Sequence, residues 1–548
     1  MARHPLAATP LARGPHGPIP ALPSRHGGAA WTRALVDALH PAPRGRAPRP
    51  RRDRVVVIGA GMGGLAAALR LAADGCDVTV LERAAHLGGK ARTIEVGGRA
   101  VDAGPTVFTM RWVFDDLFAA AGTALDDHLA LMPATVLARH AWPDGTRFDL
   151  FADLERTADG IHAFAGAAEA ERYRAFARQT ERAYAVFRES FIEGARPGPL
   201  DVVARIGLRG LPALIAARPS ANMFRAIADT LQDDRLRQLF ARYATYCGSS
   251  PYRAPATLML IAHVERLGVW QIAGGMQALA GALAGRIEAA GGRIRTGATV
   301  ERIETEGGRV SAVRLAGGER IGCEAVVFNG DAGALGAGLL GAEAARAVRP
   351  VAPARRSLSA MVWSVNAPAT GFPLSHHTVF FGPEYRAEFE RMGAGHLPRD
   401  PTTYVCALDR PAEEAVEGGP GPERCHVQVN APAIGDLRAL SAAEIETCRR
   451  ETEALMARAG LALSLAPETS RLTTPREFAR LFPGTGGALY GAATHGPVAS
   501  FLRPAARTRV PGLVLAGGSA HPGAGVPMAA LSGAQAATAV TAHLRALP

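Results

Sequence analysis

Lysine, paired cysteines and long apolar runs are all missing from this sequence. Lys90 is the single lysine among 61 basic residues, and the six cysteines form no CxxC pair. Neither a disulfide framework nor a cysteine-rich metal site is indicated, so we expect free thiols and no bound metal. No apolar run reaches the roughly 20 residues that a membrane-spanning helix needs, and we predict no such helix. Aromatic residues make up only 6% of the chain, which argues mildly against an aromatic cage for a cationic ligand.

The excess positive charge lies at one end of the sequence. Residues 1–54 hold ten arginines and two acidic residues, whereas residues 55–548 hold 51 basic and 48 acidic residues. The body is therefore nearly neutral and gives no sign of a basic groove for a nucleic acid, so we expect no nucleic-acid partner. Residues 1–50 contain ten prolines, and we interpret them as a disordered basic extension, with a targeting role as the alternative.

The chain is long enough for more than one folding unit, because it has 548 residues of which 48% are hydrophobic. Helical patterns predominate over residues 116–262, and we predict few strands there. Strand patterns separated by glycine pairs cover residues 293–303, 309–315 and 325–328. A mixed pattern follows, with strands indicated near residues 362, 379, 404 and 427, and a helix pattern at 528–544 closes the chain.

A glycine-rich turn follows the first strand pattern of the body. The apolar run RVVVI leads into GAGMGG, an alanine-rich helix pattern and a second strand pattern, DVTVL. Gly59, Gly61 and Gly64 have the spacing GxGxxG, and Glu82 ends the second strand eighteen residues beyond Gly64. Glycine here permits a tight turn, the approach of a pyrophosphate to the backbone and close packing of helix on strand. Because Glu82 can accept hydrogen bonds from a ribose diol, the unit predicts a Rossmann-like dinucleotide site.

Two further segments favour a flavin dinucleotide over NAD. Gly88, Gly89 and Lys90 form a second glycine pair with an adjacent cation just beyond the ribose acid. Near the C-terminus, GGSAHPGAGVP follows an apolar strand pattern and precedes a helix pattern, so it predicts a rigid loop against which a flat ring can lie. A strand over residues 295–300 fits the adenine side, with Val300 as the expected backbone contact.

Together these segments resemble the bacterial carotenoid (phytoene) desaturases of the flavin amine-oxidase-like superfamily. The likeness covers almost everything after residue 53 and includes GAGMGGLAAALRLAADGCDVTVLERAAHLGGKART, LSHHTVFFGPEYRAEFE, TPREF, GALYG, FLRP and GGSAHPGAGVPMAALSG. AGPTVFTMRWVFDDLF and RYATYCGSSPYRAPATLMLIAHVE look like the 1-hydroxycarotenoid 3,4-desaturase branch. The basic, proline-rich leader departs from the family pattern.

The resemblance implies an α/β fold with a Rossmann-like FAD-binding domain, a discontinuous substrate domain and a helical membrane-associated region. We assign residues 51–125, 270–345 and 480–548 to the FAD-binding domain, and residues 126–269 and 346–479 to the substrate and membrane-associated domain. FAD is the implied cofactor. The predicted cofactor-binding residues are Gly59, Gly61, Gly63, Gly64, Glu82, Arg83, Gly89, Lys90, Gly104, Pro105, Thr106, Val300, Gly517, Gly518, Gly525, Val526 and Pro527.

The activity that the resemblance implies is removal of two hydrogens from adjacent saturated carbons of a 1-hydroxycarotenoid such as hydroxyneurosporene. These C–H bonds are barely acidic, so the reaction needs a hydride acceptor such as a flavin, and the neighbouring proton then leaves. The alternatives are a phytoene desaturase, another flavin amine-oxidase-like oxidoreductase and a flavin-dependent carotenoid isomerase. Either a quinone or oxygen serves as the electron acceptor.

Proton acceptors are less sharply indicated than the cofactor site. Glu265 and His376 are the candidate catalytic residues, and a place on a helix surface is the alternative for Glu265. His376 and His377 are adjacent in a strand pattern, so at most one of them faces a pocket. Arg111 and Trp112 are expected to border the ring or recognise the substrate hydroxyl, with a structural role as the alternative for the tryptophan.

A long polyene is almost insoluble in water, so an enzyme acting on it must meet it at a membrane. Residues 201–219 interleave apolar residues with arginines, a short basic amphipathic pattern suited to an anionic surface. A helical element of the core is the alternative for this segment. We expect a cytoplasmic protein that associates peripherally with the inner or intracytoplasmic membrane.

Overall fold

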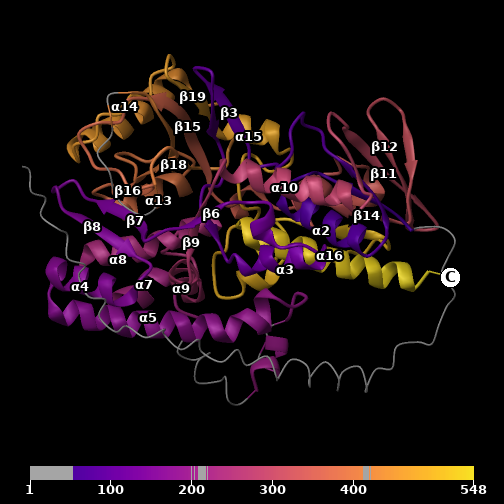
Figure 1. Cartoon of the computed structure of the whole chain (residues 1–548), viewed down its shortest axis with the longest axis horizontal. Helices are drawn as coiled ribbons and strands as arrows, with labels where there is room; N and C mark the ends of the chain where they lie inside the picture. The colour runs from indigo at the N-terminus through magenta and orange to yellow at the C-terminus, as the bar shows by residue number, and fades with distance from the viewer. Residues whose placement is uncertain are drawn as a thin grey trace, which may run out of the picture. The chain divides into compact units, whose positions relative to one another are not determined.

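The first strand, helix and strand of the body form a parallel βαβ unit in the computed structural model (Figure 1). The structure describes residues 53–547 apart from 199, 203, 208–217, 219, 412–418 and 420. β1 (Arg54–Ile58) and β2 (Asp77–Leu81) have the bounds that the apolar runs predict. α2 (Met62–Ala73) begins three residues before the alanine-rich pattern, because Gly63 and Gly64 belong to its first turn.

Five parallel strands make the central sheet, in the order β10-β2-β1-β14-β20. Its other members come from distant parts of the chain: β10 (Arg293–Arg295), β14 (Ala325–Phe328) and β20 (Leu513–Leu515). α10 (Gly275–Ala289) and the C-terminal α16 (Val526–Arg545) pack beside α2. The first and last helices of the described chain therefore lie side by side over one face of this sheet.

The alternation of side chains along β1 explains the two layers that cover the sheet. Val55 and Val57 pack into the core formed with α2, α10 and α16. Val56 and Ile58 point to the opposite face, where they pack against the small antiparallel sheet. That sheet has the order β11-β12-β13, and its strands are Val300–Glu306, Arg309–Leu315 and Arg320–Gly322.

A second large sheet of seven strands has the order β19-β15-β18-β17-β16-β7-β8. In that order its strands are Ser470–Thr473, Ser359–Ala367, Glu423–Ala431, Thr403–Ala407, His377–Phe380, Val136–Ala141 and Arg147–Phe151. A three-stranded sheet, β5-β9-β6 (Phe108–Thr109, Val269–Ile272 and Leu131–Pro133), links it to the helices. The hairpin β3-β4 (Thr93–Val96 and Arg99–Asp102) packs against β15 and β18.

Helices fill the space on either side of the seven-stranded sheet (Figure 1). Grouped beside β7 and β8 are α4 (Leu154–Ala165), α5 (Ala167–Phe187), α7 (Met223–Ala228) and α8 (Asp234–Ala241). The π-helical turn η2 (Arg188–Ile192) continues α5, and the 3-10 turns η3 (Arg242–Cys247) and η4 (Ala256–Met259) lead into α9 (Leu260–Arg266). Three more helices border the sheets: α3 (Trp112–Ala120), α13 (Tyr385–Gly393) and α14 (Ala442–Arg458).

One strand prediction is wrong. Residues 293–303 do not form one strand, because Gly297 adopts a left-handed turn (φ 67°) that sends β10 and β11 into different sheets. Residues 116–262 are mainly helical, as the pattern predicts, and the few strands among them are β6, β7 and β8. Arginines within β7 and β8 interrupt their apolar pattern, and Arg139 pairs across the two strands with Asp149 at 2.7 Å.

The strands of the five-stranded sheet lie within the residue ranges predicted for the FAD-binding domain, and those of the seven-stranded sheet lie within the ranges predicted for the substrate domain. Residues 52–548 form one compact unit. Among the described residues, no helix is both long enough and apolar enough to span a membrane.

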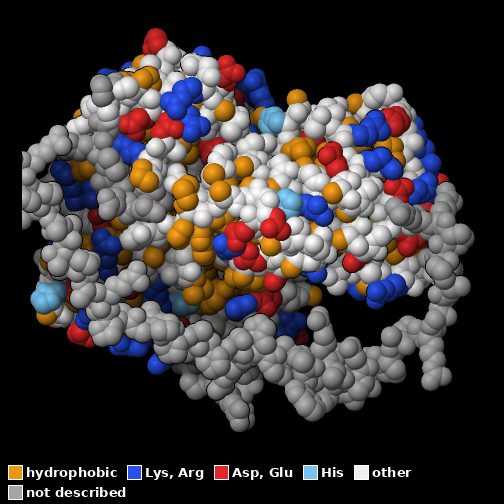
Figure 2. All heavy atoms as spheres, in the orientation of Figure 1, with side chains coloured by type: hydrophobic (Ala, Val, Ile, Leu, Met, Phe, Trp, Pro, Cys, Tyr) orange, Lys and Arg blue, Asp and Glu red, His pale blue; other side chains and the backbone are white. Residues whose placement is uncertain are grey.

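On the face in Figure 2, basic and acidic side chains are intermixed, and hydrophobic side chains gather near β9 and α9. The extension 1–50 and most of the predicted amphipathic segment 201–219 lie outside the described residues.

Candidate active site

A cavity of about 740 Å³ lies at the carboxyl ends of β1, β2 and β14. We call it the glycine-lined cavity, because glycines from both ends of the chain form much of its wall. The predicted residues in its lining are Gly59, Gly61, Gly63, Glu82, Arg83, Gly89, Lys90, Gly104, Pro105, Val300, Gly517, Gly518, Gly525 and Val526. Gly61 and Gly525 therefore share one cavity although more than 400 residues separate them in sequence.

The N-terminus of α2 faces this cavity, with Gly61 at the capping position. No side chain caps the helix, so its first N–H groups remain available to an anion. A Cβ on Gly61 would lie 2.9 Å from the side-chain nitrogen of Asn329, in the space that a pyrophosphate needs. Gly64 does not line the cavity, but a Cβ there would lie 2.1 Å from the Gly59 carbonyl oxygen, so glycine permits the close contact of helix and turn.

Glu82 stands at the carboxyl end of β2, where its carboxylate lines the cavity. Its two oxygens accept hydrogen bonds from the N–H groups of Ala60 (2.7 Å) and Ala84 (2.8 Å). Each oxygen retains a further lone pair that can accept a hydrogen bond from a ribose hydroxyl. Val300 lines the same cavity as the first residue of β11, so the predicted strand over 295–300 is wrong while the predicted contact residue lies at the cavity.

Lys90 lines the glycine-lined cavity, and the charge of Arg503 acts on it from nearby. The Lys90 ammonium donates a hydrogen bond to the Leu489 carbonyl and lies 5.3 Å from the Phe482 ring centroid. Desolvation lowers the pKa of Lys90, and the nearby Asp331 opposes that shift. Arg503 donates hydrogen bonds to the carbonyls of Tyr490, Gly518 and Ala492, so it ties the C-terminal glycine loop to the loop segment 490–492.

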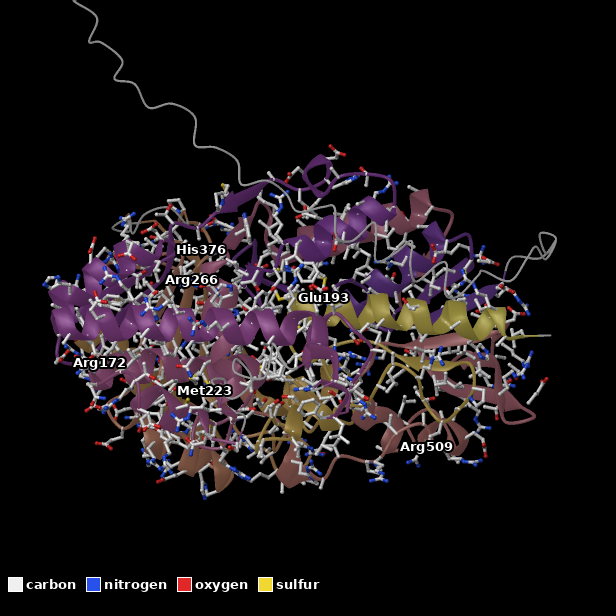
Figure 3. All side chains as sticks on the ribbon, turned by 90° about the horizontal axis from the view of Figure 1, so that it is seen from below. Arg172, Glu193, Met223, Arg266, His376 and Arg509 are labelled. Atoms are coloured by element: carbon white, nitrogen blue, oxygen red, sulfur yellow. The ribbon has the colours of Figure 1, made fainter. Side chains whose placement is uncertain are left out.

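The C-terminal loop is also fixed from the helical side. His521 is fully buried, and its Nε2 lies 3.1 Å from the Gly194 carbonyl oxygen. Burial lowers the pKa of His521 to about 4, so the ring is neutral at physiological pH. Gln535 of α16 also donates to the Gly194 carbonyl, at 2.9 Å. Figure 3 shows the neighbouring Glu193 where the α5–η2 helix ends beside α16.

A second cavity, of about 540 Å³, adjoins the first and has a mainly apolar wall. We call it the apolar cavity. Thr106 and Pro527, which were predicted to bind the cofactor, line this cavity and not the glycine-lined one. Seven residues line both cavities: Gly104, Pro105, Gln428, Tyr490, Ala524, Gly525 and Val526. A molecule in the apolar cavity can therefore place one end against a ring held by the C-terminal glycine loop.

Glu265 belongs to the wall of the apolar cavity. The alternative of an exposed helix-surface carboxylate is wrong, because Glu265 is only 5% exposed and accepts a 2.6 Å hydrogen bond from the Tyr243 hydroxyl. Burial raises the pKa of Glu265, although hydrogen bonds from Tyr243 and Tyr246 oppose the rise. A carboxylate in this setting is a stronger base than one in water.

His376, the other candidate, lines neither cavity. Its Nδ1 lies 3.0 Å from the Ala407 carbonyl oxygen, and its ring is buried within the seven-stranded sheet region, away from α16 in Figure 3. His377 also lines neither cavity, but its Nδ1 shares a 2.8 Å hydrogen bond with the Tyr404 hydroxyl, which belongs to the apolar cavity. The structure therefore brings Glu265 to the site and leaves His376 outside it.

His376, His377 and Cys406 hold potential ligand atoms within 4.8 Å of one another, as the one such buried group among the described residues. Their polar atoms already have partners inside the protein, including a 3.6 Å contact between the Cys406 sulfur and His376 Nε2. Burial raises the pKa of the Cys406 thiol, which keeps it protonated. A protonated thiol is a poor metal ligand, so this chemistry fits an internal hydrogen-bonded cluster.

Arg111 and Trp112 also lie outside both cavities, so the expectation that they border the ring is wrong. Arg111 forms ion pairs with Asp115 and Asp126 on the surface of α3. The Arg188 guanidinium lies 4.6 Å from the Trp112 ring centroid. Thr109 and Met110, just before them in sequence, are the residues of this segment that reach the apolar cavity.

Sequence reasoning missed the polar residues that surround Glu265. Arg242, Tyr246 and Tyr404 line the apolar cavity together with it. The signal available in sequence was the run RYATY, which places an arginine and a tyrosine four residues apart on one helical face. That run also falls in a segment of the predicted desaturase branch, whereas Tyr404 reaches the group only through the pairing of β16, β17 and β18.

Comparison with known proteins agrees with this geometry. Residues 62–541 match the family described as flavin containing amine oxidoreductase. The chain is 52% identical to the hydroxyneurosporene desaturase of Rubrivivax gelatinosus, over 90% of this chain and 94% of that protein. It is 47% identical to the protein of the same name from Cereibacter sphaeroides (90% and 98% covered) and 30% identical to the lycopene-forming phytoene desaturase of Pseudescherichia vulneris (86% and 96% covered).

Solved structures show the same fold at much lower sequence identity. Cyclohexylamine oxidase from Brevibacterium oxydans matches with a TM-score of 0.55 and 16% identity, over 90% of this chain and all of that one. An oxidoreductase from Methanosarcina mazei matches with the same TM-score and identity, over 89% of this chain and all of that one. From the family match and the desaturase relatives, the chain belongs to the flavin-containing amine oxidoreductase family and, within it, to the carotenoid desaturases.

Proposed function

We propose that this protein is an FAD-dependent desaturase that introduces a carbon–carbon double bond into a 1-hydroxylated carotenoid during carotenoid biosynthesis. The observation that carries the proposal is the junction of the two cavities at seven shared residues. A glycine-lined site for a flavin dinucleotide and an apolar site for a long hydrocarbon meet there. The names of the relatives with the highest identities given above support the class of substrate.

The residues present fit FAD. The free N-terminus of α2 can hold the pyrophosphate, Glu82 the ribose, and the loop from Gly517 to Val526 the flat ring. When bound, FAD supplies the hydride acceptor that an unactivated C–H bond requires. Glycine and proline at the shared wall leave room for the substrate carbon to approach closely, within about 3–3.5 Å of its reaction partner.

The protein's own chemical contribution is to orient the substrate, exclude water and accept the proton. Loss of one hydride and one proton from adjacent carbons leaves a double bond, so the proton needs an acceptor beside the reacting carbons. Glu265 is the carboxylate in the wall of the apolar cavity, and its raised pKa suits it to that role. The buried setting also keeps water from the cationic intermediate that hydride loss creates on the polyene.

Product analysis tests the proposed function. Purified protein in liposomes, supplied with FAD, is incubated separately with 1-hydroxyneurosporene and with phytoene. We expect the first reaction to give a product two mass units lighter that absorbs at longer wavelength, and the second to give none. Desaturation of phytoene alone would assign the protein to a different step, and a change of polyene geometry without loss of hydrogen would make it an isomerase.

The second half of the reaction needs an oxidant that takes up two electrons, and we propose a quinone or oxygen. Anaerobic turnover distinguishes the two. With a soluble quinone analogue and no oxygen, more product than enzyme shows that a quinone is sufficient. A single turnover that resumes only when air is admitted shows that oxygen is the acceptor.

We also propose that the protein works at the cytoplasmic surface of the inner or intracytoplasmic membrane, with the apolar cavity open toward the lipid. Val202, Val498 and Phe501 line this cavity, and Phe501 packs against Phe191 with ring centroids 5.2 Å apart. Beside them, Leu200 is 83% exposed and Leu502 is 57% exposed. Exposed apolar side chains around the entrance of an apolar cavity suit entry of a hydrocarbon from a bilayer.

Replacing both Val498 and Leu502 by aspartate is expected to lower binding to liposomes by at least about tenfold. The two side chains are exposed, so the change removes apolar contact with lipid at little expense in folding stability. Sedimentation with liposomes of phosphatidylcholine and phosphatidylglycerol measures the effect. Leu437→Asp is the matched control, because Leu437 is also exposed (61%) but lies outside both cavities, and equal losses in the two variants would contradict the proposal.

A further inference from the structure

Among the described residues, three charged ones line the apolar cavity: Arg242, Glu265 and Arg503. Arg503 is held by three backbone carbonyls, so its guanidinium has a structural task. Arg242 and Glu265 have a different setting, because tyrosine side chains surround them. A charged pair in a cavity for a hydrocarbon is costly to desolvate, and such groups are retained where they bind or react.

Arg242 has unused hydrogen-bond donors. Its guanidinium donates to the Tyr246 hydroxyl at 3.2 Å and lies 5.2 Å and 5.5 Å from the ring centroids of Tyr246 and Tyr404. It forms no ion pair within 4 Å and no second hydrogen bond among the described residues. A guanidinium carries five N–H donors, so most of them are free for a molecule in the cavity.

Glu265 supplies the complementary acceptor. Its carboxylate is bonded by the Tyr243 and Tyr246 hydroxyls, and the Tyr246 hydroxyl also receives the hydrogen bond from Arg242. The Tyr246 hydroxyl therefore joins the arginine to the carboxylate. This cluster offers both donors and an acceptor, the combination that binds an alcohol.

The cluster lies at the flavin end of the apolar cavity. The Tyr404 hydroxyl shares a 2.6 Å hydrogen bond with Thr106, which directly follows Gly104 and Pro105 of the shared wall. The register of β17 and β18 places Tyr404 opposite Gln428, another residue that lines both cavities. A polar group bound by Arg242 beneath the Tyr404 ring is thus close to the reacting position.

We infer that Arg242, with Tyr246 and Tyr404, binds the tertiary hydroxyl of the carotenoid and sets the specificity for hydroxylated substrates. The inference rests on the proposed function. In a 1-hydroxylated carotenoid the hydroxyl-bearing carbon is only two bonds from the nearer carbon of the new double bond. The hydroxyl must therefore sit beside the reacting carbons, where this cluster lies. The same spacing places Glu265 next to the proton that leaves.

Arg242→Met tests the inference, because methionine keeps the length of the side chain and removes the charge and the donors. Binding of 1-hydroxyneurosporene and of neurosporene, which lacks the hydroxyl, is measured on the flavin-loaded protein by the shift of the polyene absorption band. We expect the variant to lose about 10- to 100-fold in affinity for the hydroxylated carotenoid, the size typical of a hydrogen bond to a charged group. Affinity for neurosporene should be unchanged or higher, since no unpaired guanidinium then faces it.

Arg266→Met is the matched control, because Arg266 lies on α9 beside Glu265 but lines neither cavity. Equal weakening of both carotenoids in Arg242→Met would show a structural role and overturn the inference. If Arg242→Met retains no flavin, the affinities of the wild-type protein for 1-hydroxyneurosporene and for neurosporene are compared instead. A preference for the hydroxylated carotenoid below about threefold overturns the inference. A larger preference that Arg242→Lys reduces supports it. Preferential binding of the hydroxylated carotenoid without desaturation would overturn the proposed function and leave the inference standing. Desaturation by the wild-type protein, with an unchanged binding preference in Arg242→Met, would overturn the inference and leave the proposed function standing.

Discussion

Gly61→Val is expected to yield a protein that purifies without flavin. The backbone of Gly61 has φ −75°, which valine tolerates, so the effect comes from volume and not from strain. The new Cβ would lie 2.9 Å from the Asn329 side-chain nitrogen, and its methyl groups would fill the space before the N-terminus of α2. Losing two charge-assisted hydrogen bonds to phosphate costs about 3–6 kcal/mol, so we expect at least about a 100-fold loss of FAD affinity.

The flavin content per protein, read from the absorption spectrum, and titration of the apoprotein with FAD measure this loss. Gly281→Val is the control, because Gly281 lies in α10 with no atom within 4 Å of the position that a Cβ would occupy and without an unusual backbone angle. Both variants should keep the far-UV circular dichroism of the parent protein. A Gly61→Val protein that is fully loaded with flavin would show that the pyrophosphate does not bind at this helix.

The second large effect is expected from Glu265→Gln, which should lower the rate of desaturation by about 10²- to 10⁴-fold. Glutamine preserves the shape of the side chain and still accepts the hydrogen bond from Tyr243, but it cannot take up a proton. Flavin content and carotenoid binding should be close to those of the parent. Single-turnover kinetics on the loaded protein separate the chemical step from binding.

The pH dependence of this reaction has a definite sign. The base must be ionised, so the rate falls as the pH drops through the pKa of Glu265, and burial raises that pKa above the ordinary range of glutamate. Glu265→Gln should lose this acidic limb. Glu388→Gln is the control, because burial also raises the pKa of Glu388, to about 8, but Glu388 lines neither cavity. An acidic limb that persists in Glu265→Gln would exclude this carboxylate as the base.

Much of the cofactor site could be predicted from sequence because its determinants are local. The strand, turn and helix around Gly61 follow one another directly, and their apolar and glycine patterns have one structural solution. The C-terminal loop was predicted for the same reason, since small residues between an apolar strand and a helix are visible in sequence. The structure brings both segments into one cavity.

The substrate side depended on contacts between distant segments, which sequence patterns do not show. His376 and Arg111 were singled out for their chemistry, but strand register buries one and a pair of aspartates holds the other at the surface. Arg242 is one arginine among many in a sequence almost without lysine, so its residue type alone does not mark it. Only the packing of η3, α9 and β17 around one cavity distinguishes it.

The contact of α2 with α16 also determines when the protein can acquire its cofactor. A Cβ on Gly533 would lie 2.1 Å from the Gly63 carbonyl oxygen, so the first and last helices of the body meet backbone to backbone. α16 is synthesised after every other described helix and strand, and until then the nascent polypeptide has only part of the nucleotide pocket. Loading of the cofactor therefore has to wait for α16, and chains cut short before Gly517 should emerge colourless and become substrates for proteolysis.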